Sequence, residues 1–250
     1  MNPQPLLRAK RIAPALAFLM LTLSACASIP EDERTASDPW EPINRPLFSL
    51  NMNIDKVSTK PLAKGYRKIL PGPMRKGFSN FFSNLAAPRS VINNFLQGKP
   101  GHSLSELGRF VVNSTIGLGG LIDVATANGI EEHREDFGQT AAVWGIPDGP
   151  YVMLPFLGPR TLRDAIFTPL DVITNPLYPY DGSSTVRTSL YVLQLIDTRY
   201  LLLPADKYLE ESKDPYVTLR ESYLQNRQFE VYDGDPPEDD EFFDEFFEED

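Results

Sequence analysis

Residues 73–98 read PMRKGFSNFFSNLAAPRSVINNFLQG, and the spacing of their apolar side chains is that of a helix. Pro73 suits a first helical turn, where the amide hydrogen has no partner within the helix. Apolar residues then recur at three- and four-residue steps: Phe78, Phe81, Phe82, Leu85, Val91, Ile92, Phe95 and Leu96. Because proline removes an internal hydrogen bond, we expect Pro88 to interrupt this helix and Gly98 to end it.

Helical signals also dominate the rest of the chain. Ser103 and Glu106 have the spacing of a capping box at a helix start. Further helices are expected over about 121–128, 184–203 and 215–228. The best strand candidate is YVML at 151–154. The predicted fold class is therefore mostly α.

Proline is frequent for a helical protein, since 20 of the 23 prolines follow residue 25. They recur at the expected element boundaries, which predicts short, broken helices rather than a regular bundle. Short amphipathic helices are marginal in water and gain stability by packing on a core or a membrane. The pattern fits a protein at a lipid surface and also an irregular soluble domain.

The N-terminal 25 residues have the order of a secretory signal. Three basic residues precede the apolar run IAPALAFLMLTL, which is too short to span a membrane. Leu23-Ser24-Ala25-Cys26 resembles the lipobox of bacterial lipoproteins, with the only cysteine of the chain as the first mature residue. That resemblance implies a diacylglyceryl group on the thiol and a further acyl chain, such as palmitate, on the new amino terminus. More than one acyl chain gives a stable membrane anchor. The alternative is a buried structural cysteine that follows an ordinary cleaved signal.

Charge divides the mature chain. After residue 25 it has 21 basic and 34 acidic residues, and eleven of the acidic ones lie in the last eighteen, DGDPPEDDEFFDEFFEED. We therefore predict a signal peptide over 1–25, a polar lipidated tether over 26–37, a helical domain over 38–232 and an acidic disordered tail over 233–250. The domain is close to neutral, which gives no reason to propose nucleic-acid binding.

The sequence offers little for catalysis. Its two histidines are His102 and His133, and the GxSxG motif of many lipases is absent. His133 lies among carboxylates in EEHRED, without the second histidine four residues away that a zinc helix has. We expect a solvated loop there. No cofactor, metal site or catalytic residue is predicted, and the chain is interpreted as a non-enzyme.

Two stretches are candidates for contact with lipid headgroups. The first, residues 56–76, has seven basic residues and no acidic one, and it places Lys64 and Lys68 four apart on one helical face. Such a face attracts anionic headgroups, although a solvated face is the simpler explanation. The second is WGIPDGPYVMLPFLGPRTLRD at 144–164. It forms either an apolar wall beside a polar rim that ends in Arg160, Arg163 and Asp164, or a rigid connecting loop packed on the core.

Five blocks, in order, resemble the MlaA lipoprotein family, also called VacJ. The blocks are DPWEPINRPLFSLN (38–51), FLQGKP (95–100), RFVVNSTIGLGGLIDVA (109–125), EDFGQTAAVWGIPDGPYVMLPFLGPRTLRD (135–164) and DPYVTLRESYLQNR (214–227). Together they span about 38–228. The acidic tail matches none of them, and its phenylalanines mark either a partner-docking helix face or a flexible solubilising segment.

The resemblance implies an irregular ring of short amphipathic helices embedded in one leaflet, the periplasmic-side leaflet of the outer membrane, around an amphipathic channel. It implies three partners: phospholipid, a trimeric outer-membrane porin and a periplasmic lipid carrier. The implied function is to remove mislocalised phospholipids from the outer leaflet and pass them to that carrier, which maintains lipid asymmetry. A phospholipid-cleaving enzyme and a porin-binding structural adaptor are the alternatives.

Overall fold

The computed structural model describes residues 38–177 and 183–237. In chain order its elements are α2 (Glu41–Val57), α3 (Thr59–Ile69), α4 (Gly72–Leu96), α5 (Pro100–Thr115), α6 (Val124–Ala127), α7 (Phe137–Val143), β1 (Tyr151–Leu154), β2 (Gly158–Thr161), α8 (Leu162–Thr174), α9 (Ser184–Leu201), α10 (Ala205–Glu211) and α11 (Pro215–Val231). The predicted signal peptide, the lipidation site Cys26, the tether and tail residues 238–250 lie outside the described residues. The mostly α fold class is confirmed.

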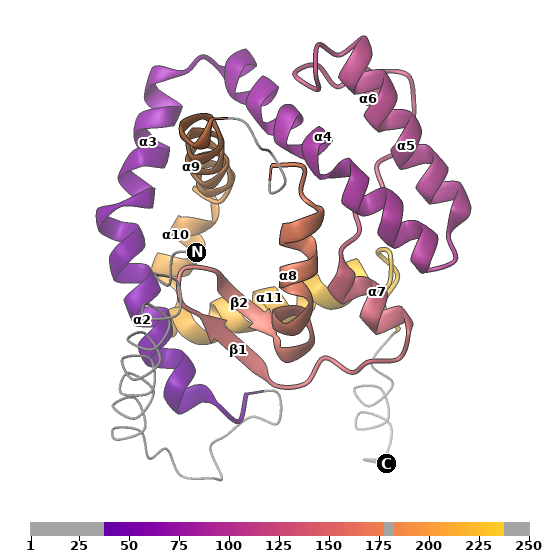
Figure 1. Ribbon diagram of the computed structural model, residues 1–250. Coiled ribbons are helices and arrows are strands. Elements are labelled where there is room, and N and C mark those ends of the chain that lie inside the picture. Colours follow the sequence, from indigo (N-terminus) through magenta and orange to yellow (C-terminus); the bar gives the residue numbers. More distant parts are fainter. Residues whose placement is uncertain (1–37, 178–182, 238–250) are drawn as a thin grey trace, which may run out of the picture.

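The helices follow one another in a ring (Figure 1). α2 and α3 form one side, α4 crosses to the other, and α5 packs along α4. α7 and α8 continue the circuit from α4, and the antiparallel hairpin of β1 and β2 closes it against α2. α9 packs on α3 and α4, while α11 lies along β2.

Asn44 fastens α2 to the hairpin. Its Nδ2 donates hydrogen bonds to Asp38 Oδ1 (2.8 Å) and to the carbonyl of Tyr151 (3.0 Å), and its Oδ1 accepts one from the amide of Met153 (2.9 Å). The small hydrophobic core lies next to this contact, where Tyr151, Met153 and Tyr216 are buried together. A buried amide with its donors and acceptor engaged stabilises one register of the hairpin against the helix.

Two local predictions in the α4–α5 region are wrong. Pro88 does not interrupt the helix, because α4 runs for 25 residues with Pro88 inside it and is supported along its length by α5, α9 and α7. Ser103 and Glu106 do not form a capping box, since α5 begins at Pro100 and both lie inside the helix. Ser103 Oγ instead donates to the carbonyl of Val91 (2.9 Å).

The segment around His133 is a loop, as predicted, with Glu131, Glu132 and Arg134 exposed, but its backbone is held by the neighbouring helices. The amide of His133 donates to Glu106 Oε1 (2.5 Å), and Asn94 Nδ2 donates to the carbonyl of His133 (2.9 Å). The ring of His133 stacks on that of His102, with centroids 3.8 Å apart. These contacts fix the connection between α6 and α7 against α4 and α5.

Other elements agree with the sequence. The helices predicted over about 184–203 and 215–228 are α9 and α11, and YVML is β1. The helix predicted over about 121–128 is the shorter α6, which starts after the N-cap Asp123 and stops before Gly129 at φ 77°.

Polarity is inverted relative to an ordinary soluble domain. Among the described residues, buried polar and charged side chains outnumber buried hydrophobic ones, twenty to eleven. Large apolar side chains are instead exposed on α4, α5, α8 and the hairpin, for example Phe95 (69 %), Leu104 (70 %) and Phe156 (75 %). An extended apolar exterior of this kind marks contact with a membrane or another protein. None of the helices in the described part of the chain combines the length and the hydropathy needed to cross a membrane.

Candidate functional site

A cavity of about 450 Å³ lies between the helices and the hairpin. Its walls come from α4, α7, the end of the hairpin, α8, α9 and α11, which Figure 1 shows facing one another. The charged residues of the lining are Arg89, Asp136, Arg160, Asp164, Asp171, Arg227 and Glu230. A polar cavity within an apolar exterior is the feature that we take as the candidate site.

One wall belongs to α11. The helix starts at Asp214, whose carboxylate accepts hydrogen bonds from the amides of Tyr216 (3.0 Å) and Val217 (3.3 Å), with Pro215 in the first turn. Tyr223, Arg227 and Glu230 follow at four- and three-residue steps. This spacing puts them on one face of the helix, and all three line the cavity.

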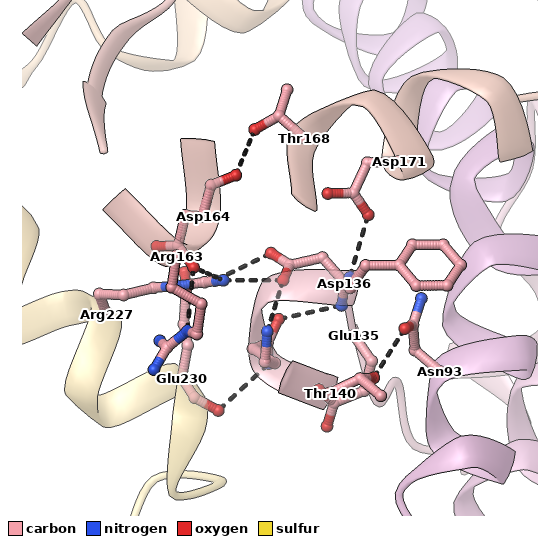
Figure 2. Close-up of polar contacts among 12 residues, drawn as sticks. Asn93, Glu135, Asp136, Thr140, Arg163, Asp164, Thr168, Asp171, Arg227 and Glu230 are labelled. Atoms are coloured by element: carbon pink, nitrogen blue, oxygen red, sulfur yellow. Dashed lines mark hydrogen bonds and ion pairs between the residues drawn. The ribbon is translucent and has the colours of Figure 1, made fainter. Parts of the chain in front are cut away.

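Arg227 joins three elements through one guanidinium group (Figure 2). Nη1 and Nη2 donate to Asp136 at 2.8 and 2.7 Å, and Nη2 also donates to Asp164 Oδ1 at 2.8 Å. Nη1 reaches Glu230 at 2.9 Å. A buried arginine needs such bidentate partners to offset the loss of its hydration. We call Arg227, Asp136, Asp164 and Glu230 the arginine hub.

The contacts of the hub shift the pKa values of Asp136 and Arg227. Burial alone would raise the pKa of Asp136, but the hydrogen bonds and charge of Arg227 outweigh it and hold that pKa below its ordinary value. Burial disfavours the charged form of Arg227, yet Asp136 and Asp164 raise the pKa of its guanidinium. Asp136 and Arg227 are therefore both charged throughout the neutral range.

α7 places Asp136 in the hub by means of a capping box. Asp136 Oδ1 accepts from the amide of Gln139 (2.8 Å), and the Gln139 side chain accepts from the amide of Asp136 (3.1 Å). Gly138 lies inside this turn, where a Cβ atom would overlap Asp164 Oδ1 and Arg227 Nη2. The position thus admits no side chain without displacing the hub.

Asp171 faces the hub from the next turns of α8 (Figure 2). Its Oδ1 accepts a hydrogen bond from the amide of Phe137 (3.1 Å) and lies 3.9 Å from Arg89 Nε. Burial, together with the nearby charge of Asp136, raises the pKa of Asp171 to about 6, although Arg89 opposes the shift. The negative charge of Asp171 is therefore only weakly compensated by neighbouring positive charge.

The candidate residues from the sequence separate in the structure. Arg160, on β2, lines the cavity, and its Nη1 donates to the carbonyl of Pro159 (2.8 Å). Arg163 is buried and ion-paired with Asp148 (2.5 Å), with its Nε 3.6 Å from Asp164 Oδ1, so it presents no charge at the rim. Lys64 and Lys68 are exposed on α3 and do not line the cavity.

Each alternative for the 144–164 stretch describes part of it. Tyr151 and Met153 pack in the core, as a rigid connecting segment would. Trp144, Phe156 and Leu157 are exposed apolar side chains, as an apolar wall would need, and Leu157 lines the cavity.

The sequence did not identify the hub. Asp136-Phe137-Gly138-Gln139 does have the spacing of a capping box, and that signal was available. Nothing in the sequence, however, joins Asp136 to Arg227, which is 91 residues away.

Comparisons with known proteins agree with this architecture. The family model described as MlaA lipoprotein matches residues 36–230. The Shigella flexneri protein named "Intermembrane phospholipid transport system lipoprotein MlaA" is 40% identical over 229 residues, which cover 88% of this chain and 89% of that protein. The Haemophilus influenzae protein of the same name is 33% identical over 236 residues, 91% of this chain and 93% of that protein.

A solved structure reported under the words "Structural basis for maintenance of bacterial outer membrane lipid asymmetry" superposes with a TM-score of 0.68. It is 38% identical in sequence, and the match covers 78% of this chain and 99% of that one. The family model, the relatives and the shared fold lead to one conclusion: this chain belongs to the MlaA lipoprotein family.

Proposed function

We propose that this protein is an outer-membrane lipoprotein that removes mislocalised phospholipids from the outer leaflet and passes them to a periplasmic carrier. The relatives named as parts of an intermembrane phospholipid transport system support this proposal. In the same proposal Cys26 carries the lipid anchor, the domain lies at the periplasmic-side leaflet, and a trimeric porin is its neighbour. The protein moves lipid and does not cleave it.

The observation that carries the proposal is the inverted polarity of the ring. A phospholipid has an ionic headgroup, which is costly to bury without partners, and two acyl tails, which need an apolar surround. The charged cavity offers the headgroup a polar route through the domain. The exposed apolar side chains on α4, α5 and α8 offer the tails and the surrounding lipid an apolar exterior.

The test measures outer-leaflet phospholipid in cells of the parent bacterium that lack this protein. The readout is phospholipid that an externally added phospholipase can reach, with wild type or Cys26→Ala restored from a plasmid. We expect the deletion to raise accessible phospholipid, wild type to reverse the rise, and Cys26→Ala to fail at equal protein abundance.

Two outcomes would contradict the proposal. An unchanged surface after deletion, with porin still copurifying, would favour a structural adaptor. Lysophospholipid or free fatty acid released by purified protein from phospholipid vesicles would favour an enzyme.

A further inference from the structure

The charged groups of the cavity outside the arginine hub make few contacts with the described residues. Arg227 is shared among Asp136, Asp164 and Glu230, and Glu230 Oε1 also accepts from Asn226 (2.8 Å). The two terminal nitrogens of Arg227 are satisfied by these carboxylates, while its buried Nε donates to no described residue, and the capping box of α7 fixes Asp136. The hub therefore serves as a rigid wall, and recognition of a ligand falls to the other charged groups.

Two cations in the lining donate no hydrogen bond to a carboxylate of the described residues, and both can bind an anion. Arg160 makes no ion pair with any described residue, and its only hydrogen bond to one of them is to the carbonyl of Pro159. Arg89 has a buried Nε that donates to no described residue, and its contact with Asp171 is long at 3.9 Å. Guanidinium groups in this condition are suited to phosphate, which accepts two donors at once.

One carboxylate in the lining is also weakly paired. Asp171 Oδ1 accepts a single backbone hydrogen bond, and none reaches its Oδ2 from the described residues. The whole lining has four carboxylates against three arginines. A ligand with both a phosphate and an ammonium group would complement this arrangement, whereas a purely anionic headgroup would leave Asp171 without a partner and repel it.

We propose that the cavity selects phospholipids with an ammonium group in the headgroup, such as phosphatidylethanolamine, with Arg160 and Arg89 binding the phosphate and Asp171 binding the ammonium. This inference rests on the proposed function, because it assigns the substrate class of the same cavity. It makes Asp171 the residue that determines specificity and Arg160 the residue that binds every phospholipid.

The raised pKa of Asp171 predicts that the headgroup selectivity depends on pH. The charged groups that face it are Asp136 from α7, Arg89 from α4 and Arg227 from α11, and the outcome is a pKa raised to about 6. Asp171 is then mostly ionised at pH 7.5 and mostly protonated at pH 5. The selectivity for an ammonium headgroup should therefore be present at the higher pH and be lost as the pH falls below about 6.

The experiment measures affinities of the full-length lipidated protein in detergent by titration calorimetry. The ligands are dihexanoyl phosphatidylethanolamine and dihexanoyl phosphatidylglycerol below their micellar concentrations, with inorganic phosphate as a separate arm. Wild type should favour the ethanolamine lipid by about threefold to tenfold, the effect of one partly buried ion pair. Asp171→Asn should bring the ratio near one, while Asp171→Glu should keep the preference.

The controls separate specificity from folding. Arg160→Gln should weaken both lipids by the same factor, because both carry the phosphate. Glu211→Gln removes an exposed carboxylate outside the cavity and should change neither affinity. If Asp171→Asn lowers the Tm, the pH 5 measurement on wild type tests the same charge without a mutation.

The outcomes distinguish the two proposals. Equal affinity of wild type for both lipids would overturn the selectivity but leave the transport function standing. No binding of either lipid would count against the cavity as a headgroup route, and so against both. Binding of inorganic phosphate as strong as that of the lipids would show an anion site without headgroup selectivity and would overturn the inference.

Discussion

At the level of single residues, Arg227 joins the walls of the cavity through its bonds to Asp136 and Asp164. Replacing Arg227 by Met would remove the cation that binds both Asp136 and Asp164, and would leave Asp164 only its longer contact with Arg163 at 3.6 Å. Removing one partner of such a buried pair costs about 3 kcal/mol or more, because the remaining charge stays uncompensated. We expect that loss in the free energy of unfolding, measured by chemical denaturation of the detergent-solubilised protein.

The matched control for Arg227→Met is Lys207→Gln. Lys207 is exposed, and among the described residues its one ion pair is with Glu211 on the same helix at 3.7 Å, a contact that contributes about 0.5 kcal/mol or less. If the two variants lost equal stability, the hub would not be a stabilising cluster.

Gly138 offers a test by added volume. A methyl group there would meet Asp164 Oδ1 and Arg227 Nη2, so Gly138→Ala must either break the hub or shift α7. Overpacking of this kind costs about 2 kcal/mol. In contrast, Gly108→Ala in α5 meets nothing within 4 Å and should add up to about 1 kcal/mol of stability through helix propensity. Chemical denaturation measures the free energy of unfolding of both variants. An unchanged free energy for Gly138→Ala would show that α7 shifts without cost.

At the level of elements, α3 is the place where the basic stretch acts. The helix packs on α9 through Ala63 and Tyr66 and leaves Lys64 and Lys68 exposed on its other side, close to the exposed Leu62 and Ile69. Lys60, by contrast, is occupied by Asp206 (3.0 Å) and Glu210 (2.7 Å). An amphipathic face with free cations suits the boundary between anionic headgroups and acyl chains.

Charge reversal tests that role of α3. Lys64→Glu with Lys68→Glu should weaken binding of the protein to vesicles that contain anionic lipid by about tenfold, at about 1 kcal/mol for each basic side chain removed and with added repulsion. Lys207→Glu with Lys213→Glu changes the net charge equally at two other exposed positions and should have a smaller effect. Cosedimentation with vesicles measures both, and equal losses would mean that only net charge matters.

The elements also show what the sequence could predict. α9, α11 and β1 depend on local spacing and on local signals such as Asp214-Pro215, which are readable in a single sequence. The predictions at Pro88 and Ser103 are wrong because the packing of α4 against α5 and α9 outweighs the local preferences of these residues. The hub was invisible for another reason: its partners lie 91 and 63 residues apart, and only the closed ring brings them together.

At the level of the whole molecule, the balance of buried carboxyl groups predicts how stability varies with pH. Burial raises the pKa of Glu135 to about 7, although Gln97 and Lys99 oppose the shift, and the pKa of Asp171 is raised to about 6. A carboxyl group whose folded-state pKa is raised holds its proton more tightly in the folded state. Its contribution to stability is therefore full at low pH and is lost as the pH rises through the folded-state value.

Groups with lowered pKa act in the opposite direction at more acidic pH. Asp123 has a pKa lowered to about 2 by Thr126, Asn113 and Arg109 despite its burial, and Asp136 is lowered by Arg227. Their stabilisation is complete above the ordinary carboxyl pKa and is lost as the pH falls below it. His133, whose pKa is lowered mainly by burial and also by His102, adds a smaller loss as the pH falls through the ordinary histidine value.

The directions of these pKa shifts place the maximum of stability on the acidic side of neutrality. We expect the Tm of the detergent-solubilised protein to be highest near about pH 5, because unfolding near pH 5.5 releases about two protons from Glu135 and Asp171. The Tm should fall as the pH rises to about 7 and level off above it, where both groups are mostly ionised in the folded state as well. The double variant Glu135→Gln with Asp171→Asn should flatten that slope above pH 5 but keep the acid limb that Asp136 and Asp123 produce. A Tm that rises from pH 5.5 to pH 8 in wild type, or an unchanged slope in the double variant, would show that the ionisation of these two carboxylates is compensated elsewhere in the ring. In that case Asp171 would be paired in solution, and the site proposed for an ammonium headgroup would already be occupied by the protein itself.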